Sequence, residues 1–124
     1  MRIISGNFKG KKIILPKDKL TRPLKDLTKE SIFNIIKHSQ LLNVKLEQAN
    51  ILDLFSGVGS FGLECLSRGA ATVTFLESYK EVLVILKKNI INLKQENFTK
   101  LIEKDIFSEN TLKSLNNKFD IIFM

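Results

Sequence analysis

The feature that most constrains this chain is a glycine-rich turn at residues 53–62, which reads Asp-Leu-Phe-Ser-Gly-Val-Gly-Ser-Phe-Gly. The turn holds a complete G-x-G-x-x-G pattern between an apolar segment at 49–55 and an amphipathic segment at 59–68. Glycines at such a turn permit positive φ angles and let a ligand approach the bare backbone, and the amides of the following helix point at that ligand. The pattern therefore predicts a strand, a ligand-binding turn and a helix.

Beyond the turn, segments typical of strands alternate with segments typical of helices. The expected strands are 72–76, 100–103 and 119–124, and the expected helices are 79–93 and 108–115. Such an alternation predicts an α/β fold in which a parallel sheet is flanked by helices and connected by right-handed crossovers. We therefore expect the front half of a Rossmann-like sheet.

The segment that precedes the sheet is strongly basic. Residues 1–50 hold eleven Lys or Arg and four Asp or Glu, whereas residues 51–124 hold nine of each sign, so the net charge of +7 lies entirely in the first part. This asymmetry predicts a polyanion-binding segment on a neutral domain, and the alternative is an ordinary lysine-rich solvated surface. The candidate phosphate-binding residues are Arg2, Lys9, Lys11, Lys12 and Arg22.

Local patterns divide the first part of the chain further. Two short apolar runs around Gly6 and Gly10 predict a β-hairpin. The apolar spacing over residues 24–38 predicts an amphipathic helix. We therefore expect a basic N-terminal hairpin and linker at 1–23, followed by a Rossmann-like ligand-binding domain at 24–124.

Two carboxylates are expected at the ends of the second and third strands. Glu77 lies 20 residues after Gly57, a spacing at which a carboxylate accepts hydrogen bonds from the hydroxyls of a ribose. Asp105 follows the third strand and is placed to accept a hydrogen bond from an adenine amino group, with Ile106 beside it to pack on the ring. The alternatives are that Glu77 is an ordinary exposed strand-end residue and that Asp105 caps the next helix.

Asp53 is unusual because it lies inside an otherwise apolar strand. A carboxylate there destabilises the fold unless it is paired or hydrogen-bonded. Nicotinamide enzymes usually keep this strand apolar, so Asp53 favours a cationic ligand group, such as the ammonium or sulfonium region of S-adenosylmethionine. The alternative is a structural carboxylate held by the amides of the loop.

Two blocks of sequence carry a family resemblance. One runs from Leu52 to Ala70 through the glycine turn, and the other joins residues 1–12 with 21–23 and 29–34. The first block resembles class I methyltransferases in general. Together the two blocks resemble the RsmD-like family, which methylates the exocyclic N2 of a guanine in small-subunit ribosomal RNA. The resemblance extends over essentially the whole chain.

The resemblance implies the roles of the site residues. It implies that the turn with Gly57 and Gly59 holds the methionine part of S-adenosylmethionine. It also implies that Glu77 binds the ribose and that Asp105 binds the adenine. The residues expected to contact the cofactor are Asp53, Phe55, Gly57, Gly59, Glu77, Ser78, Asp105 and Ile106.

The end of the sequence bears on catalysis. Residues 119–124 resemble the fourth strand of the family, which leads into an Asp-Pro-Pro-aromatic motif that holds the target base. The sequence stops at Met124, immediately before that motif. We therefore expect the catalytic residues just after Met124, and we expect this chain to hold the cofactor half of the site. An open edge on the fourth strand would expose apolar side chains, which predicts self-association.

Three other classes of function remain open. They are a nicotinamide or flavin-binding half-domain, a non-catalytic RNA-binding remnant, and a methyltransferase for another base of RNA or DNA. A single cysteine argues against a disulfide scaffold, and no apolar run approaches the roughly 20 residues of a membrane span. We expect a cytoplasmic protein whose partner is small-subunit ribosomal RNA or its assembly intermediate, with no metal and no membrane.

Overall fold

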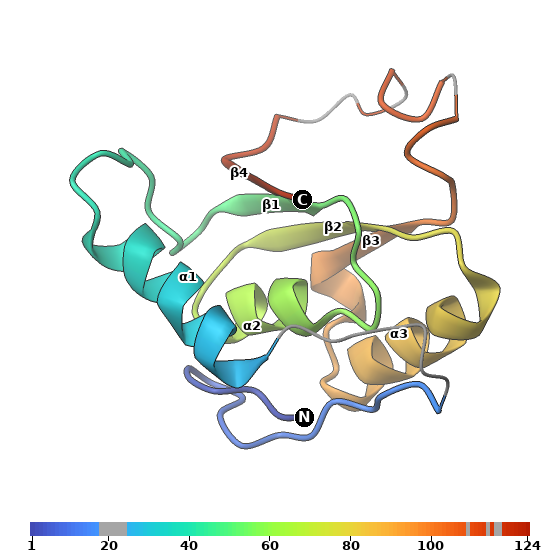
Figure 1. Ribbon diagram of the computed structural model, residues 1–124, viewed down its shortest axis with the longest axis horizontal. Helices are drawn as coiled ribbons and strands as arrows, with labels where there is room; N and C mark the ends of the chain where they lie inside the picture. Colours follow the sequence, from blue (N-terminus) through green and yellow to red (C-terminus); the bar gives the residue numbers. More distant parts are fainter. Residues whose placement is uncertain (18–24, 109, 114, 116–117) are drawn as a thin grey trace.

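A parallel sheet forms the centre of the molecule in a computed structural model that describes residues 1–17, 25–108, 110–113, 115 and 118–124 (Figure 1). Within those residues the sheet has four strands in the order β3-β2-β1-β4. The strands are β1 (Asn50–Asp53), β2 (Thr72–Leu76), β3 (Thr99–Ile102) and β4 (Ile121–Phe123). Every pairing is parallel, so the carboxyl ends of the strands meet at one end of the sheet. The predicted α/β fold is confirmed.

Helices flank this sheet. They are α1 (Asp26–His38), α2 (Ser60–Ser67) and α3 (Lys80–Asn92), and a 3-10 turn, η1 (Glu96–Phe98), precedes β3. Figure 1 shows α2 and α3 on the same side of the sheet, where each connects two neighbouring parallel strands. α1 packs on α2 through Phe33, whose ring stacks on Phe61 with the centroids 5.2 Å apart.

The two faces of the sheet carry separate apolar clusters. Because side chains alternate along a strand, Ile51, Val73 and Phe75 point to the same face, where all three are fully buried in the main core beneath the helices. The opposite face carries a smaller cluster. Its buried members are Leu52, Leu54 and Leu76, and its partly buried neighbours are Ile102, Ile106, Leu115 and Phe119.

The helix predicted at 108–115 is wrong for the described part of that segment, which forms bends and turns. The backbone carbonyl of Asp105 accepts hydrogen bonds from the Ser108 amide at 3.0 Å and from the Thr111 hydroxyl at 2.7 Å. Polar side chains that bond to nearby backbone compete with helix formation. The polar sequence of this segment therefore favours a turn built around Asp105 over a helix.

The N-terminal segment, residues 1–17, packs into the main core. Its two arms pair as the sequence predicts, although the hairpin is reduced to one antiparallel bridge between Arg2 and Lys12. Ile3 and Ile13 are 0% and 3% exposed and belong to the same core cluster as the sheet residues. This basic segment therefore packs against the α/β unit through buried apolar side chains.

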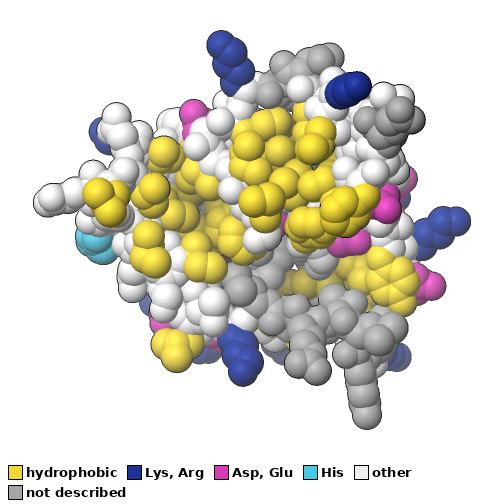
Figure 2. Space-filling model, turned by 45° about the horizontal axis from the view of Figure 1, so that its top comes forward, with side chains coloured by type: hydrophobic (Ala, Val, Ile, Leu, Met, Phe, Trp, Pro, Cys, Tyr) yellow, Lys and Arg dark blue, Asp and Glu magenta, His cyan; other side chains and the backbone are white. Residues whose placement is uncertain are grey.

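β4 forms one edge of the sheet among the described strands. Ile122 is 56% exposed and Met124 is 81% exposed. β4 lies at the top of Figure 1. Figure 2 turns this top toward the viewer and shows hydrophobic side chains gathered on that face. Self-association through this edge stays a prediction. No helix in the described ranges is long and apolar enough to cross a membrane.

Candidate functional site

The glycine turn lies directly after β1 and leads into α2. Gly57 has a φ angle of +54° and Gly59 one of +91°, a region that residues with a side chain rarely adopt. A Cβ added to Gly57 would meet no atom within 4 Å, whereas one added to Gly59 would lie 2.6 Å from Leu86 Cδ1. Gly57 is therefore open to an approaching ligand, and Gly59 allows the turn to pack closely against α3.

Glu77 follows β2 and contacts this turn. Its Oε2 accepts a hydrogen bond from the Gly57 amide at 2.9 Å, and its Oε1 accepts from the amides of Ser78 and Tyr79, each at 3.0 Å. A carboxylate offers about four acceptor sites, so these bonds fix its orientation and leave capacity for a further donor. The structure thus brings together the glycines and the carboxylate that the sequence spacing singled out.

Asp53 ends β1 and is 1% exposed. Among the described residues, neither of its carboxylate oxygens has a hydrogen-bond partner. Burial raises the pKa of this carboxyl to about 7; the nearby amides of Gly62 and Phe55 offset part of the rise, and the charge of Glu77 adds to it. The two amides act on the charge without reaching hydrogen-bond geometry. The cationic ligand group expected at Asp53 stays a prediction, beside the alternative of a structural carboxylate near the loop amides.

Asp105 lies beyond β3 and is exposed. Its Oδ1 accepts a hydrogen bond from the Phe107 amide at 2.9 Å, so the side chain caps a local turn rather than a helix. Ile106 packs on the small apolar cluster of the sheet. Phe55 and Phe107 are 54% and 83% exposed, and their ring centroids lie 6.2 Å apart. Phe107 was not among the site residues predicted from the sequence, although its position two residues after Asp105 could have suggested it.

The strand order explains why these residues belong to one site. β3, β2 and β1 are neighbours and parallel, so the segments that follow them emerge at the same end of the sheet. In open α/β sheets this end is where ligands bind. The predicted cofactor residues that lie there are Asp53, Phe55, Gly57, Gly59, Glu77, Ser78, Asp105 and Ile106.

The predicted phosphate-binding residues lie elsewhere. Arg2, Lys9, Lys11 and Lys12 are exposed on the N-terminal segment, and Arg22 lies outside the described residues. The tip of this segment contacts the end of α2, because the amides of Asn7 and Phe8 donate to the Ser67 carbonyl and hydroxyl at 2.8 and 2.9 Å. The basic tip is therefore at the opposite end of α2 from the glycine turn.

Sequence reasoning also missed the buried pair of Lys29 and Glu64, whose charged atoms lie 3.2 Å apart with both side chains 0% exposed. Lys29 and Phe33 are the buried residues of α1 and lie four positions apart on one face. The apolar positions that predicted this helix include Leu27 and Ile35, which are 76% and 57% exposed, so the sequence pattern did not mark the face that is buried. Within the described ranges, no three His, Cys, Asp or Glu side chains come together as metal ligands.

Comparisons with known proteins agree with this architecture. Residues 1–124 match the model of a family described as conserved hypothetical protein 95, and the chain belongs to this family. Ribosomal RNA small subunit methyltransferase D of Buchnera aphidicola subsp. Baizongia pistaciae is 35% identical over 127 residues, with 100% of this chain and 59% of the relative covered. The protein of the same name from Haemophilus influenzae is 38% identical over 129 residues, with 100% and 62% covered.

A solved structure gives the same result. The putative methyltransferase yhhF from Escherichia coli superposes with a TM-score of 0.70 at 31% identity, covering 85% of this chain and 52% of that protein. The resemblance to the RsmD-like family is therefore confirmed. The chain spans between half and two thirds of the length of these relatives.

Proposed function

We propose that this chain forms the cofactor-binding part of an S-adenosylmethionine-dependent methyltransferase. The observation that carries the proposal is the buried carboxylate of Asp53, which has no hydrogen-bond partner in the described part of the chain and precedes the open turn at Gly57. A cationic ligand group stabilises such a carboxylate, and S-adenosylmethionine has one in the ammonium of its methionine part. When bound, this cofactor supplies an electrophilic methyl group on a sulfonium.

The other residues at the carboxyl end of the sheet would orient the same molecule. Glu77 keeps acceptor capacity for a ribose hydroxyl beside its bonds to the amides of Gly57, Ser78 and Tyr79. Asp105 uses one oxygen for the Phe107 amide, and its second oxygen would accept from the adenine amino group. Apolar surface for the ring comes from Ile106, with Phe55 at the rim and Ser78 next to Glu77.

We further propose that the substrate is the exocyclic N2 of a guanine in small-subunit ribosomal RNA. The names of the relatives support small-subunit ribosomal RNA, and the basic N-terminal segment supports a polyanionic substrate. Such an amine is a poor nucleophile until it is aimed at the methyl group, so the enzyme must supply acceptors for its hydrogens. Asp120 does not supply one, because it precedes β4 and its Oδ2 accepts from the Asn50 amide at 2.8 Å. Catalytic groups beyond Met124 stay a prediction.

Calorimetric titration of the chain with S-adenosylhomocysteine tests the cofactor assignment, with NAD as the competing ligand. We expect S-adenosylhomocysteine to bind and NAD to bind weakly or not at all. Glu77→Ala should weaken the binding by about 1–3 kcal/mol, because charged hydrogen bonds are lost. Glu96→Ala, which removes an exposed carboxylate before β3, is the matched control. Equal affinities of wild type and Glu77→Ala would remove Glu77 from the site.

Salt dependence of RNA binding tests the substrate class. Replacing Lys9, Lys11 and Lys12 together with Gln should reduce the slope of log affinity against log salt by about 2–3 units, since each phosphate contact contributes roughly 0.7–0.9. Replacing three exposed lysines that are not part of this segment, Lys88, Lys94 and Lys100, is the matched control. An unchanged slope in the first variant would mean that the basic segment is solvated surface only.

A further inference from the structure

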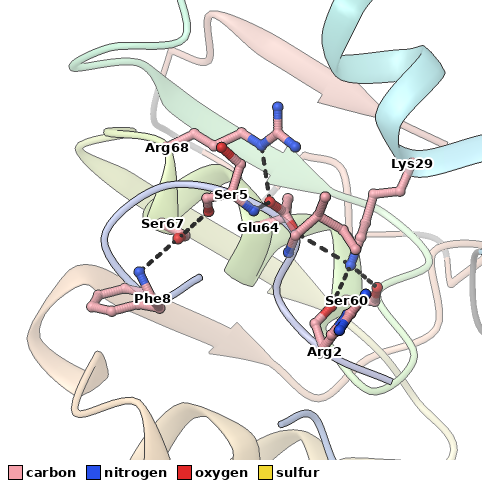
Figure 3. Close-up of polar contacts among 9 residues, drawn as sticks. Arg2, Ser5, Phe8, Lys29, Ser60, Glu64, Ser67 and Arg68 are labelled. Carbon is pink, nitrogen blue, oxygen red and sulfur yellow. Dashed lines mark hydrogen bonds and ion pairs between the residues drawn. The ribbon is translucent and has the colours of Figure 1, made fainter. Parts of the chain in front are cut away.

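A buried cluster joins three separate segments beside the start of α2 (Figure 3). The ammonium of Lys29 in α1 donates to the Arg2 backbone carbonyl at 3.2 Å and to Ser60 Oγ at 3.3 Å, and it pairs with Glu64 Oε1 at 3.2 Å. An ammonium has three donor hydrogens, and these three acceptors match them. With its side chain 0% exposed, Lys29 has one well-defined position between the N-terminal segment and α2.

The contact with Ser60 bears directly on the glycine turn. Ser60 is the first residue of α2, it follows Gly59, and it is 5% exposed. Helices commonly fix their first turn with a side-chain cap, but the N-cap position of α2 is Gly59, which has no side chain to make such a hydrogen bond. Lys29 instead holds the first turn from outside the helix, through Ser60 and, one turn later, Glu64.

We propose that Lys29 is a positioning residue for the glycine turn. By fixing Ser60 it fixes the amides that open α2, and these amides border the turn where the methionine part of the cofactor would lie. The inference rests on the proposed cofactor. Because Lys29 also holds the Arg2 carbonyl, it ties the placement of the basic N-terminal segment to the geometry of the turn.

The rival explanation is that Lys29 only balances the charge of Glu64. Arg68 separates the two explanations, because its Nε pairs with Glu64 Oε2 at 2.9 Å but it lies at the other end of α2. If charge balance is the whole role, losing either cation should have similar consequences. If Lys29 positions the turn, only its loss should reach the cofactor.

The experiment compares Lys29→Met, Ser60→Ala and Arg68→Met in the full chain. Without ligand, hydrogen exchange over residues 60–63 should accelerate by about fivefold or more in the first two variants and stay unchanged in Arg68→Met. The readout is the amide of Leu63, which donates to the Gly59 carbonyl at 2.9 Å. The dissociation constant for S-adenosylhomocysteine should rise about tenfold in Lys29→Met and a few-fold in Ser60→Ala, since bonds to a charged group are lost. In Arg68→Met it should stay within about twofold, although the melting temperature falls.

Ser60→Ala keeps every charge in place, so it decides the question even if Lys29→Met does not fold. Unchanged exchange at residues 60–63 in Ser60→Ala, or equal acceleration in Lys29→Met and Arg68→Met, would overturn the proposal. Failure of the wild-type chain to bind S-adenosylhomocysteine would instead contradict the proposed function. The exchange measurement needs no ligand and still distinguishes the positioning role from charge balance.

Discussion

Two buried carboxylates, Asp53 at the end of β1 and Glu64 within α2, show how differently one molecule can treat the same chemical group. Glu64 is 0% exposed and is surrounded by donors: the amides of Ile4 and Ser5 at 2.9 and 3.0 Å, and the cations of Lys29 and Arg68. Asp53 is as deeply buried, yet it has no hydrogen-bond partner among the described residues.

The pKa values follow this contrast. Burial alone would raise the pKa of Glu64, but the Ile4 amide, Arg68 and Lys29 outweigh it and lower the pKa below its usual value. At Asp53 burial dominates and the pKa rises to about 7. Glu64 is therefore a carboxylate whose donors are built into the fold, whereas Asp53 has no such set of donors among the described residues, and its proposed counterion is a ligand group.

The largest expected effect is at Glu64. Glu64→Gln leaves the buried ammonium of Lys29 without its counterion, which should lower the free energy of unfolding by about 3–5 kcal/mol. Urea denaturation measures it, and Glu30→Gln, at an exposed position of α1, is the control. A loss below about 1 kcal/mol would show that the donors around Glu64 do not need its charge.

Asp53→Asn should act in the opposite direction on stability. The substitution removes a buried carboxyl group whose pKa is raised from 3.8 to about 7, which should increase the free energy of unfolding. The new side-chain amide lacks hydrogen-bond partners among the described residues, and this offsets part of the increase. We expect the free energy of unfolding at pH 8 to rise by about 1–3 kcal/mol while S-adenosylhomocysteine binds more weakly. If the variant is less stable and binds normally, Asp53 is structural and the contrast with Glu64 fails.

The pH dependence separates the two groups further. The lowered pKa of Glu64 gives stability that is present above the usual glutamate pKa of 4.5 and is lost as the pH falls through the folded-state pKa. The raised pKa of Asp53 has the opposite sign: destabilisation accumulates as the pH rises from 3.8 to about 7. Thermal unfolding of wild type and Asp53→Asn across pH 4 to 8 should therefore diverge with rising pH.

Ligand binding should show the same titration. If a cationic group binds ionised Asp53, the affinity for S-adenosylhomocysteine should fall by up to about tenfold for each pH unit below about 7, with proton release on binding. Calorimetry in two buffers of different ionisation enthalpy measures that release. Asp53→Asn should remove it, and its persistence in the variant would assign the proton to another group.

The smallest expected effect is at Phe107, the exposed aromatic residue near Phe55. Phe107→Ala should weaken S-adenosylhomocysteine binding by about 0.5–1 kcal/mol through lost ring contact, with no measurable change in stability because the side chain is 83% exposed. Phe98→Ala removes another exposed phenylalanine, in η1, and serves as the control. Equal binding by both variants would place Phe107 outside the cofactor site.

Much of the sheet could be predicted because local pattern and tertiary structure agree there. The apolar run at 72–76 became β2 with the predicted bounds, and the glycine turn with Glu77 assembled as its spacing indicated. Both features depend on short-range geometry: the alternation of strands and helices, and a turn that only glycines accommodate.

The features that escaped prediction depend on partners far apart in the sequence. Glu64 lies inside the recognised motif, but its donors Ile4 and Ser5 are about 60 residues away. The neighbouring sequence therefore does not indicate that its carboxylate is buried and hydrogen-bonded. The segment at 108–115 failed for a different reason, because the carbonyl of Asp105 and the hydroxyl of Thr111 compete with the helix. Asp53 was recognisable as an anomaly, but only the structure shows that none of the described residues hydrogen-bonds to its side chain.

The packing of the N-terminal segment against the core also has a consequence for the order of folding. The amide of Ile14 donates to the side chain of Asn89, 75 residues later, and Ser67 holds the tip of the same segment from 59 residues away. During synthesis these first residues leave the ribosome well before the helices that receive them. Ile3 and Ile13 must therefore remain outside a core until α2 and α3 have formed, and contacts over such separations slow folding. This segment is made before α2 and α3 but reaches its native place only once they have formed.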